Sequence, residues 1–275
     1  MTAYTGINTL TGLSAIAVPN TGTCVVCSDN TTPNPTNGVM SATFVNMEGW
    51  AGEYTGFNAL TPPGVTYFQN LFQLYYADQN GNIQRLTSPD GSTWTSQKSI
   101  GLSTSGGISA TPNGDVLHIF YRDADGGGVF HATSTDGATF TGSEYLGINT
   151  QSGLSSAVAS GLVVVTCQDN GGGGIMTGSL SPTAGWSTQY IGFNTSADPG
   201  ITALNGTFHM YNRDPGGGGI FHHTSTDGVK WSGNTYEGFN TSGACAPVVI
   251  GSTISLFYRD PSGGGVMVTN NFPTT

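Results

Sequence analysis

Charged side chains are scarce in this sequence of 275 residues, because Lys, Arg, Asp and Glu make up only 8 % of it, against about 25 % in an average soluble domain. Only six residues are Lys or Arg, and the net charge is −10. Nucleic acid and anionic membrane surfaces are excluded as partners, since both require clustered cations. The residues that normally cover helix surfaces are few, which argues against a helical protein. Hydrophobic residues at 36 %, with 10 % aromatics, are enough for a folded core and exclude disorder.

Long apolar runs are also missing, so the sequence predicts no membrane insertion. The N-terminal segment has no basic start and no continuous apolar stretch, from which we expect a cytoplasmic protein, or one released from the cell without a signal peptide. The four cysteines show no pairing pattern, and the CVVC of Cys24 and Cys27 has no second CxxC to complete a zinc site. We therefore expect buried free thiols and predict no cofactor and no metal site.

What the sequence does contain is a repeat. A Gly-apolar-Asn-Thr motif or a close variant begins at positions 6, 56, 101, 147, 192 and 238, and an Asp ends an apolar run at 29, 78, 123, 169, 214 and 260. Both landmarks recur every 45 to 50 residues. Two independent landmarks with the same spacing define six copies of one unit.

Each copy contains four short apolar or alternating segments separated by turn residues, as at 200–204, 207–214, 219–225 and 230–239 in the fifth copy. Four-stranded units of this length are typical of a β-propeller. The sequence thus predicts an all-β protein, one six-bladed propeller domain over residues 1–275. The segment TAYTG at 2–6 aligns with the end of a fourth strand, so we expect it to pair beside 266–270 and close the ring.

Strands of a propeller blade alternate in direction, which places the repeated loops on two faces. The turns SPDGSTW (88–94), STDGATF (134–140) and STDGVKW (225–231) resemble Asp-box hairpins, and we interpret them as structural. On the opposite face, the loops entering each blade meet those between its second and third strands. Four of these second loops contain runs of three or four glycines, which indicate positive φ or a close approach to the backbone.

This second face is the predicted ligand-binding face, with sites between neighbouring blades. In copies one and two, which lack the glycine run and its Arg, we expect weak binding or none. The candidate residues are Arg122, Asp123, Gly127, Gly128 and His131; Arg213, Asp214, Gly217, Gly218 and His222; and Arg259, Asp260, Gly264 and Gly265, with the entry-loop residues Asn149, Asn194 and Asn240 nearby. For the aspartates, the alternative is that they bind the amides of their own loops, and for the histidines it is cross-strand packing.

The stretch FQLYYADQNGNIQRLTSPDGSTW (72–94) resembles a blade of the fungal fucose-specific lectins, a family of six-bladed propellers, and copies three, five and six resemble it more weakly. In that family an Arg on the second strand and a Glu on the third hold the sugar. The resemblance therefore implies a propeller lectin whose sugar contacts differ from those of the family, since none of the aligned pairs here is Arg/Glu. The aligned pairs are Cys24/Ser41, Gln73/Arg85, His118/His131, Val164/Thr177, His209/His222 and Ser255/Val268.

Three function classes follow from a propeller of this kind. Repeated polar loops favour a multivalent lectin whose partners are glycans or glycoconjugates. A sialidase-like glycoside hydrolase needs arginines that converge on one ligand, whereas Arg122, Arg213 and Arg259 belong to different blades, and the four glutamates lie near outer strands. A protein-interaction scaffold of the WD40 type would show Gly-His and Trp-Asp signatures. We therefore predict a carbohydrate-binding protein without catalytic residues.

Overall fold

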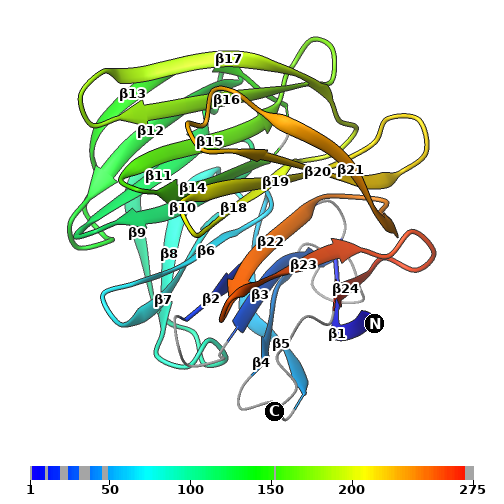
Figure 1. The fold of residues 1–275 in the computed structure, drawn as a ribbon. Coiled ribbons are helices and arrows are strands. Elements are labelled where there is room, and N and C mark those ends of the chain that lie inside the picture. The colour runs from blue at the N-terminus through cyan, green and yellow to red at the C-terminus, as the bar shows by residue number, and fades with distance from the viewer. Residues whose placement is uncertain are drawn as a thin grey trace.

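The computed structural model describes residues 2–9, 12–18, 24–30, 38–44, 49–151 and 153–269, with the backbone alone for 24–30 and for Ser96. These residues form six antiparallel sheets of four strands each, arranged as the blades of a ring (Figure 1). The predicted six-bladed β-propeller is confirmed. The described residues contain no helix, and hence none that could cross a membrane.

Five blades are each built from consecutive strands, numbered here in chain order. Blade 1 comprises β2 (Leu13–Ala17), β3 (Cys24–Asn30), β4 (Gly38–Phe44) and β5 (Trp50–Asn58). Blade 2 comprises β6 (Gly64–Phe68), β7 (Leu71–Ala77), β8 (Asn82–Ser88) and β9 (Thr95–Ser103). Blade 3 comprises β10 (Ile108–Asn113), β11 (Val116–Arg122), β12 (Gly128–Ser134) and β13 (Thr141–Asn149). Blade 4 comprises β14 (Leu154–Ala159), β15 (Leu162–Gln168), β16 (Gly174–Ser181) and β17 (Gly185–Asn194). Blade 5 comprises β18 (Gly200–Leu204), β19 (Thr207–Arg213), β20 (Gly219–Ser225) and β21 (Ser232–Asn240).

The sixth, closing blade joins the two ends of the described chain. It contains β22 (Cys245–Ile250), β23 (Thr253–Arg259), β24 (Gly265–Thr269) and, as its outer strand, β1 (Thr2–Asn8). Thr2 is paired with Thr269, and the Thr5 hydroxyl donates to the Val266 carbonyl at 2.9 Å. The predicted closure by the N-terminal segment is confirmed.

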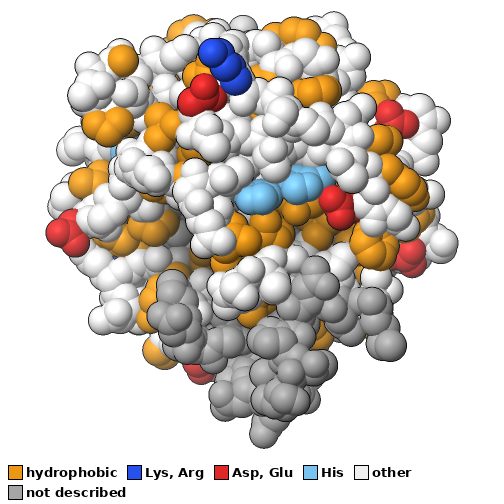
Figure 2. Space-filling view, viewed as in Figure 1, with side chains coloured by type: hydrophobic (Ala, Val, Ile, Leu, Met, Phe, Trp, Pro, Cys, Tyr) orange, Lys and Arg blue, Asp and Glu red, His pale blue; other side chains and the backbone are white. Residues whose placement is uncertain are grey.

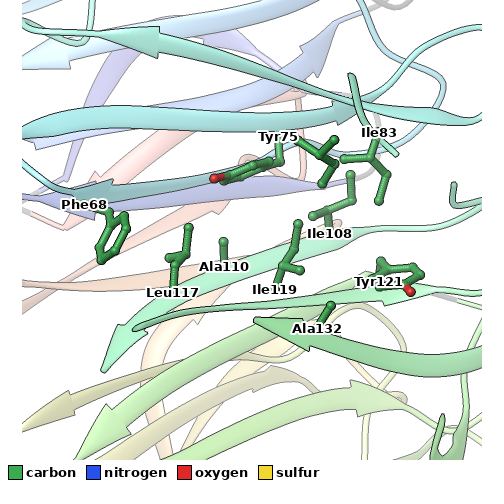
Figure 3. Packing of buried hydrophobic residues seen from close by; sticks show 10 residues of the cluster. Phe68, Tyr75, Ile83, Ile108, Ala110, Leu117, Ile119, Tyr121 and Ala132 are labelled. Carbon is green, nitrogen blue, oxygen red and sulfur yellow. The ribbon is translucent and has the colours of Figure 1, made fainter. Parts of the chain in front are cut away.

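The hydrophobic core lies between blades rather than in one central mass. One cluster joins Tyr75 and Ile83 of blade 2 to Leu117, Ile119 and Ala132 of blade 3 (Figure 3). Similar clusters occupy other junctions between neighbouring blades. Alternate residues of each strand point to opposite sides, so both sides of a blade are covered, which explains why inner strands such as β7 are almost wholly buried.

The turns between third and fourth strands are the Asp-boxes that the sequence predicts. In the turn at 134–139, the Ser134 hydroxyl donates to Asp136, which accepts the backbone amides of Ala138 and Thr139, both at 2.7 Å. These two amides lower the pKa of the Asp136 carboxyl. The aromatic that follows such a turn packs against the preceding blade. The Trp94 indole donates to Ser41 of blade 1 at 3.1 Å.

The cysteines whose side chains are described are buried free thiols, as expected. Burial raises the pKa of both Cys167 and Cys245 to about 12, so neither is a ready nucleophile or ligand at neutral pH. The side chains of Cys24 and Cys27 lie outside the described part, as does Glu48.

Candidate functional site

The entry loops and the glycine loops meet on one face, as predicted, at each junction that the structure describes fully. The backbone amide of Thr241, which follows β21, donates to the Gly218 carbonyl of the glycine loop at 2.8 Å. Thr150 donates in the same way to Gly127 at 2.8 Å, and Thr9 donates to Gly264 at 3.0 Å. The face on which these two sets of loops lie is called the glycine-loop face below.

The three arginines of the predicted sites connect these loops. The Arg213 side chain donates from Nε to the Thr241 carbonyl at 2.8 Å and from Nη1 to the Ser196 hydroxyl, so it spans the entry loops on both sides of blade 5. Gln168 makes only the first of these contacts in blade 4, donating to the Thr195 carbonyl at 2.7 Å. Arg122 and Arg259 repeat the pattern in blade 3 and in the closing blade. Each arginine therefore stays at its own junction, as the sequence predicts, and much of its donor capacity is used within the protein.

The repeated aspartates bind their own loops. Asp214 Oδ2 accepts the backbone amide of Gly216 at 3.0 Å, and Asp169 and Asp260 make the matching contacts to Gly171 at 3.1 Å and to Ser262 at 3.3 Å. These are the turn contacts that short acidic side chains make. One carboxylate oxygen is thus already engaged before any ligand arrives.

The candidate glycines have two different roles. Gly127, Gly218 and Gly264 have φ of +79°, +75° and +74°, a left-handed conformation in which a side chain is strained. Gly128 and Gly265 instead begin third strands, where an added Cβ would lie 2.9 Å from a tyrosine ring. Gly217 lies close to the Asp214 carboxylate. The glycine loops are therefore rigid turns whose shape the sequence specifies.

Two histidine pairs occupy equivalent places in blades 3 and 5, and each is extended by a glutamate of the outer strand. In blade 5, His209 Nδ1 lies 3.0 Å from His222 Nε2, and His222 Nδ1 lies 3.4 Å from Glu237 Oε1. Tyr211 stacks on His222 with ring centroids 4.6 Å apart and planes 5° apart. In blade 3 a similar series of contacts runs from His118 through His131 to Glu144, at 2.9 and 3.2 Å, although Glu144 occupies the place of Thr235 rather than of Glu237.

A carboxylate at Nδ1 favours a hydrogen on that nitrogen of the middle histidine. The Nε2 of His222 then accepts from His209 Nδ1–H, which leaves the Nε2 of His209 as an acceptor. Burial lowers the pKa of His222 and raises that of Glu237, while for His209 the neighbouring His222 adds to the effect of burial. Both histidines are accordingly neutral at pH 7, which makes the pair a hydrogen-bonding group rather than a cationic one.

The two histidine pairs differ in exposure. The Trp186 ring from blade 4 lies 5.0 Å from the His131 ring, and its indole donates to Glu144 at 2.8 Å. His131 is consequently 5 % exposed, whereas the His222 side chain is 22 % exposed at the junction with the closing blade. Histidine side chains reach the surface beside an acidic side chain near β19 and β20 (Figure 2). We call the group His209, His222, Glu237 and Tyr211 the open relay, and His118, His131 and Glu144 the covered relay.

The structure thus separates residues that the sequence placed in one site. His131 contacts His118 and Glu144 of the covered relay and also the rings of Phe120 and Trp186. None of these residues belongs to the glycine loop. Asn149, Asn194 and Asn240 do lie at the loop face, where each ends an outer strand and accepts the hydroxyl of the tyrosine four residues before it. Sequence reasoning placed the glutamates near outer strands but did not include Glu144 and Glu237 among the site residues, although they belong to the same blades as the histidine pairs.

A channel of about 660 Å³ runs through the centre of the ring, lined mainly by the inner strands. Its wall is apolar or hydroxylic, and Asp198 is the only charged residue among the described residues that line it. Asp198 accepts the backbone amide of Gly153 at 2.7 Å. Two carboxylates roughly 5–10 Å apart, as glycosidases use, are not found in the described wall.

Comparison with known proteins gives matches of structure only. No protein-family description and no curated protein matches the sequence. Among solved structures, the Aleuria aurantia lectin, a six-bladed propeller with a novel mode of fucose recognition, superposes with a TM-score of 0.69 at 15 % identity, over 94 % of both chains. This chain shares the fold of the fungal propeller lectins.

Hydrolases share the lectin-like fold as well. A Hadza microbial sialidase gives a TM-score of 0.67 at 12 % identity over 93 % of this chain and 64 % of its own. The Penicillium chrysogenum α-L-arabinanase gives 0.66 at 12 % identity over 93 % and 92 %. At these identities only the fold is shared, so function has to be argued from the residues of this chain.

Proposed function

We propose that the protein is a carbohydrate-binding lectin with several sites between blades and without catalytic activity. Its partners would be glycans or glycoconjugates, met in the cytoplasm or after release. The observation that carries the proposal is the open relay. It offers a neutral acceptor nitrogen and a carboxylate at one accessible junction, and a pyranose presents the matching hydroxyls.

The glycine-loop face provides the repetition that a lectin uses. Arg122, Arg213 and Arg259 hold three junctions in the same shape, and loops of one shape on one rigid ring give equivalent places for ligands. Several weak sites gain avidity when the ligand itself is multivalent, as cell-surface glycans are. In this proposal the loops contribute remaining donors of the arginines and backbone amides, and the aspartates act by holding the loops.

A glycan array with the soluble protein, run with and without chelator, tests the proposal. His222→Gln should lose at least tenfold in affinity for the best ligand, because it removes the ring that orients both the acceptor nitrogen of His209 and the Glu237 carboxylate. His131→Gln is the matched control, since Trp186 covers that histidine. If His222→Gln binds glycans as well as the unaltered protein does, the open relay is not the site.

The hydrolase alternative is tested separately, because the sialidase and the arabinanase have the same fold. We expect no hydrolysis of aryl sialosides or other aryl glycosides above the blank. Glu237 is the carboxylate of the open relay, and Glu144 belongs to another blade, so no second glutamate of the described part assists it. Turnover that disappears in Glu237→Gln would replace the lectin proposal with an enzyme.

A further inference from the structure

The outer strands carry a repeated exposed tyrosine that the fold does not explain. Six large hydrophobic side chains are exposed in the described part, and five of them are tyrosines at one equivalent place, between 42 % and 53 % exposed. They are Tyr4, Tyr54, Tyr145, Tyr190 and Tyr236. Every blade except blade 2 therefore presents an aromatic ring at its rim.

Each tyrosine is held in a fixed position. The Tyr190 hydroxyl donates to Asn194 Oδ1 at 3.2 Å, and an added Cβ on Gly174 would lie 2.7 Å from the ring. The ring therefore rests with one side against the glycine backbone, and its other side faces solvent. The other four hydroxyls make the same bond at 2.9 to 3.2 Å, to Asn8, Asn58, Asn149 and Asn240. We call each set of Tyr, Asn and Gly a rim platform.

Blade 2 shows that the platform is not needed to build a blade. At the three equivalent positions it has Ser99, Ser103 and Asn82, which occupy the places of Tyr, Asn and Gly in the same register. Its four strands pair as in the other blades, and Gly101 keeps the positive φ of +77° at the bulge. All three residues change together, which indicates that they act as one unit with a role other than folding.

The chemistry of a rim platform fits one class of ligand. A pre-positioned ring with one free side binds flat C–H surfaces, and its rigidity keeps the entropic cost of binding low. Because Asn194 accepts from the tyrosine through Oδ1, its Nδ2 is directed to act as a donor. Asn194 ends β17 on the glycine-loop face, where we have proposed glycan binding.

From these observations we infer that the five rim platforms are secondary carbohydrate subsites, each stacking the C–H face of one pyranose on tyrosine and donating from asparagine to its hydroxyl. This inference rests on the proposed lectin function and extends it. An oligosaccharide held at a junction would place further sugar units toward the rim, so the platforms would select longer glycans over single sugars.

The experiment uses the full chain labelled with 3-fluorotyrosine and read by ¹⁹F NMR, with resonances assigned from single Tyr→Phe variants. The probes are the methyl pyranosides of galactose, glucose, mannose, fucose and N-acetylglucosamine at millimolar concentration. Galactitol serves as the control ligand, because it has the hydroxyls but no rigid C–H face. We expect the five platform resonances to shift with at least one pyranoside and not with galactitol, while that of buried Tyr75 stays constant.

Two variants probe the platform as a unit. Asn194→Ala should weaken the response at Tyr190 roughly tenfold, since it removes both the ring's anchor and the donor. The triple variant Asn82→Gly, Ser99→Tyr, Ser103→Asn should give blade 2 a platform and a sixth responsive resonance. The inference is overturned if the platform resonances do not shift with any pyranoside, or if they shift equally with galactitol.

Failure of the inference is distinguishable from failure of the lectin proposal. The ring nitrogens of His222, followed in the same titrations in ¹⁵N-histidine-labelled protein, report on the open relay. A response at His222 without one at the tyrosines overturns the platforms and leaves the junction site intact. The reverse result supports the platforms and removes the open relay as the binding site.

Discussion

Acid should destabilise this protein over a pH range that His118 defines. His118 is buried in the covered relay, and burial together with the neighbouring His131 lowers its pKa from 6.5 to about 4. A histidine with a lowered pKa stays neutral in the folded state while the unfolded chain takes up a proton. Stability is therefore complete above pH 6.5 and decreases as the pH falls toward 4.

The expected size follows from the shift. A change of one pKa unit corresponds to about 1.4 kcal/mol, so His118 alone should cost the folded state about 3 kcal/mol by pH 4. His131 adds to this, because burial lowers its pKa as well, although Glu144 opposes the shift. Against a typical free energy of unfolding of about 5–15 kcal/mol, such a loss is easily measured.

Urea unfolding at several pH values between 7 and 4 is the assay, with His118→Gln as the comparison. Glutamine is the chain's own alternative, since Gln73 occupies the equivalent place in blade 2, buried and hydrogen-bonded. Between pH 7 and pH 4, the free energy of unfolding of the variant should fall by about 3 kcal/mol less than that of the unaltered protein. The Asp-box carboxylates also titrate in acid. The pKa of Asp90 is about 2, because the effect of burial is outweighed by hydrogen bonds from backbone amides. Such carboxylates stop stabilising the fold only below pH 4, and they do so equally in both proteins. Equal pH dependence in the two proteins would refute the reasoning.

Three further outcomes are expected. Deleting Thr2–Asn8 leaves the outer edge of β24 without a partner strand, so the melting temperature should fall and association, measured by light scattering, should rise with protein concentration. Asp136→Ala removes the acceptor for two turn amides and should cost about 1–3 kcal/mol in urea unfolding, while Asp136→Asn should cost less. Gly219→Ala places a Cβ 3.0 Å from the Tyr236 ring and should lower the free energy of unfolding by about 1–3 kcal/mol. Adding Tyr236→Ser should restore most of that stability. If stability does not recover, the assigned role of this glycine is contradicted.

The sequence predicted the fold because its landmarks are local and repeated. An Asp-box such as 134–139 is determined by side chains that form hydrogen bonds with their own turn, so it can be recognised in the sequence without knowledge of the tertiary structure. Six copies at one spacing then specify the ring, and β1 could be assigned to the closing blade because its residues match an outer strand. The loops' meeting on one face followed from strand alternation alone.

Side-chain accessibility was not predictable in this way. His131 and His222 are equivalent in the repeat, yet Trp186 of the next blade covers the first of them. That difference depends on packing between blades, which no local pattern describes. The loop arginines were predicted to lie at separate junctions, and they do. Their hydrogen bonds to entry-loop carbonyls could not be predicted, because every residue has a backbone carbonyl and the sequence does not show which of them accepts.

The pairing of β1 with β24 determines when the ring can be completed. Thr5 and Val266 are 261 residues apart, and at about 5–20 residues per second, synthesis of the chain between them takes roughly 13 to 50 seconds. Blades 1 to 5 can each fold as soon as their own four strands have emerged, whereas β1 has to wait for its partner. During that interval β1 has no partner and can pair with the β24 of a second nascent chain, so closely spaced ribosomes should favour exchanged dimers and widely spaced ones single closed rings.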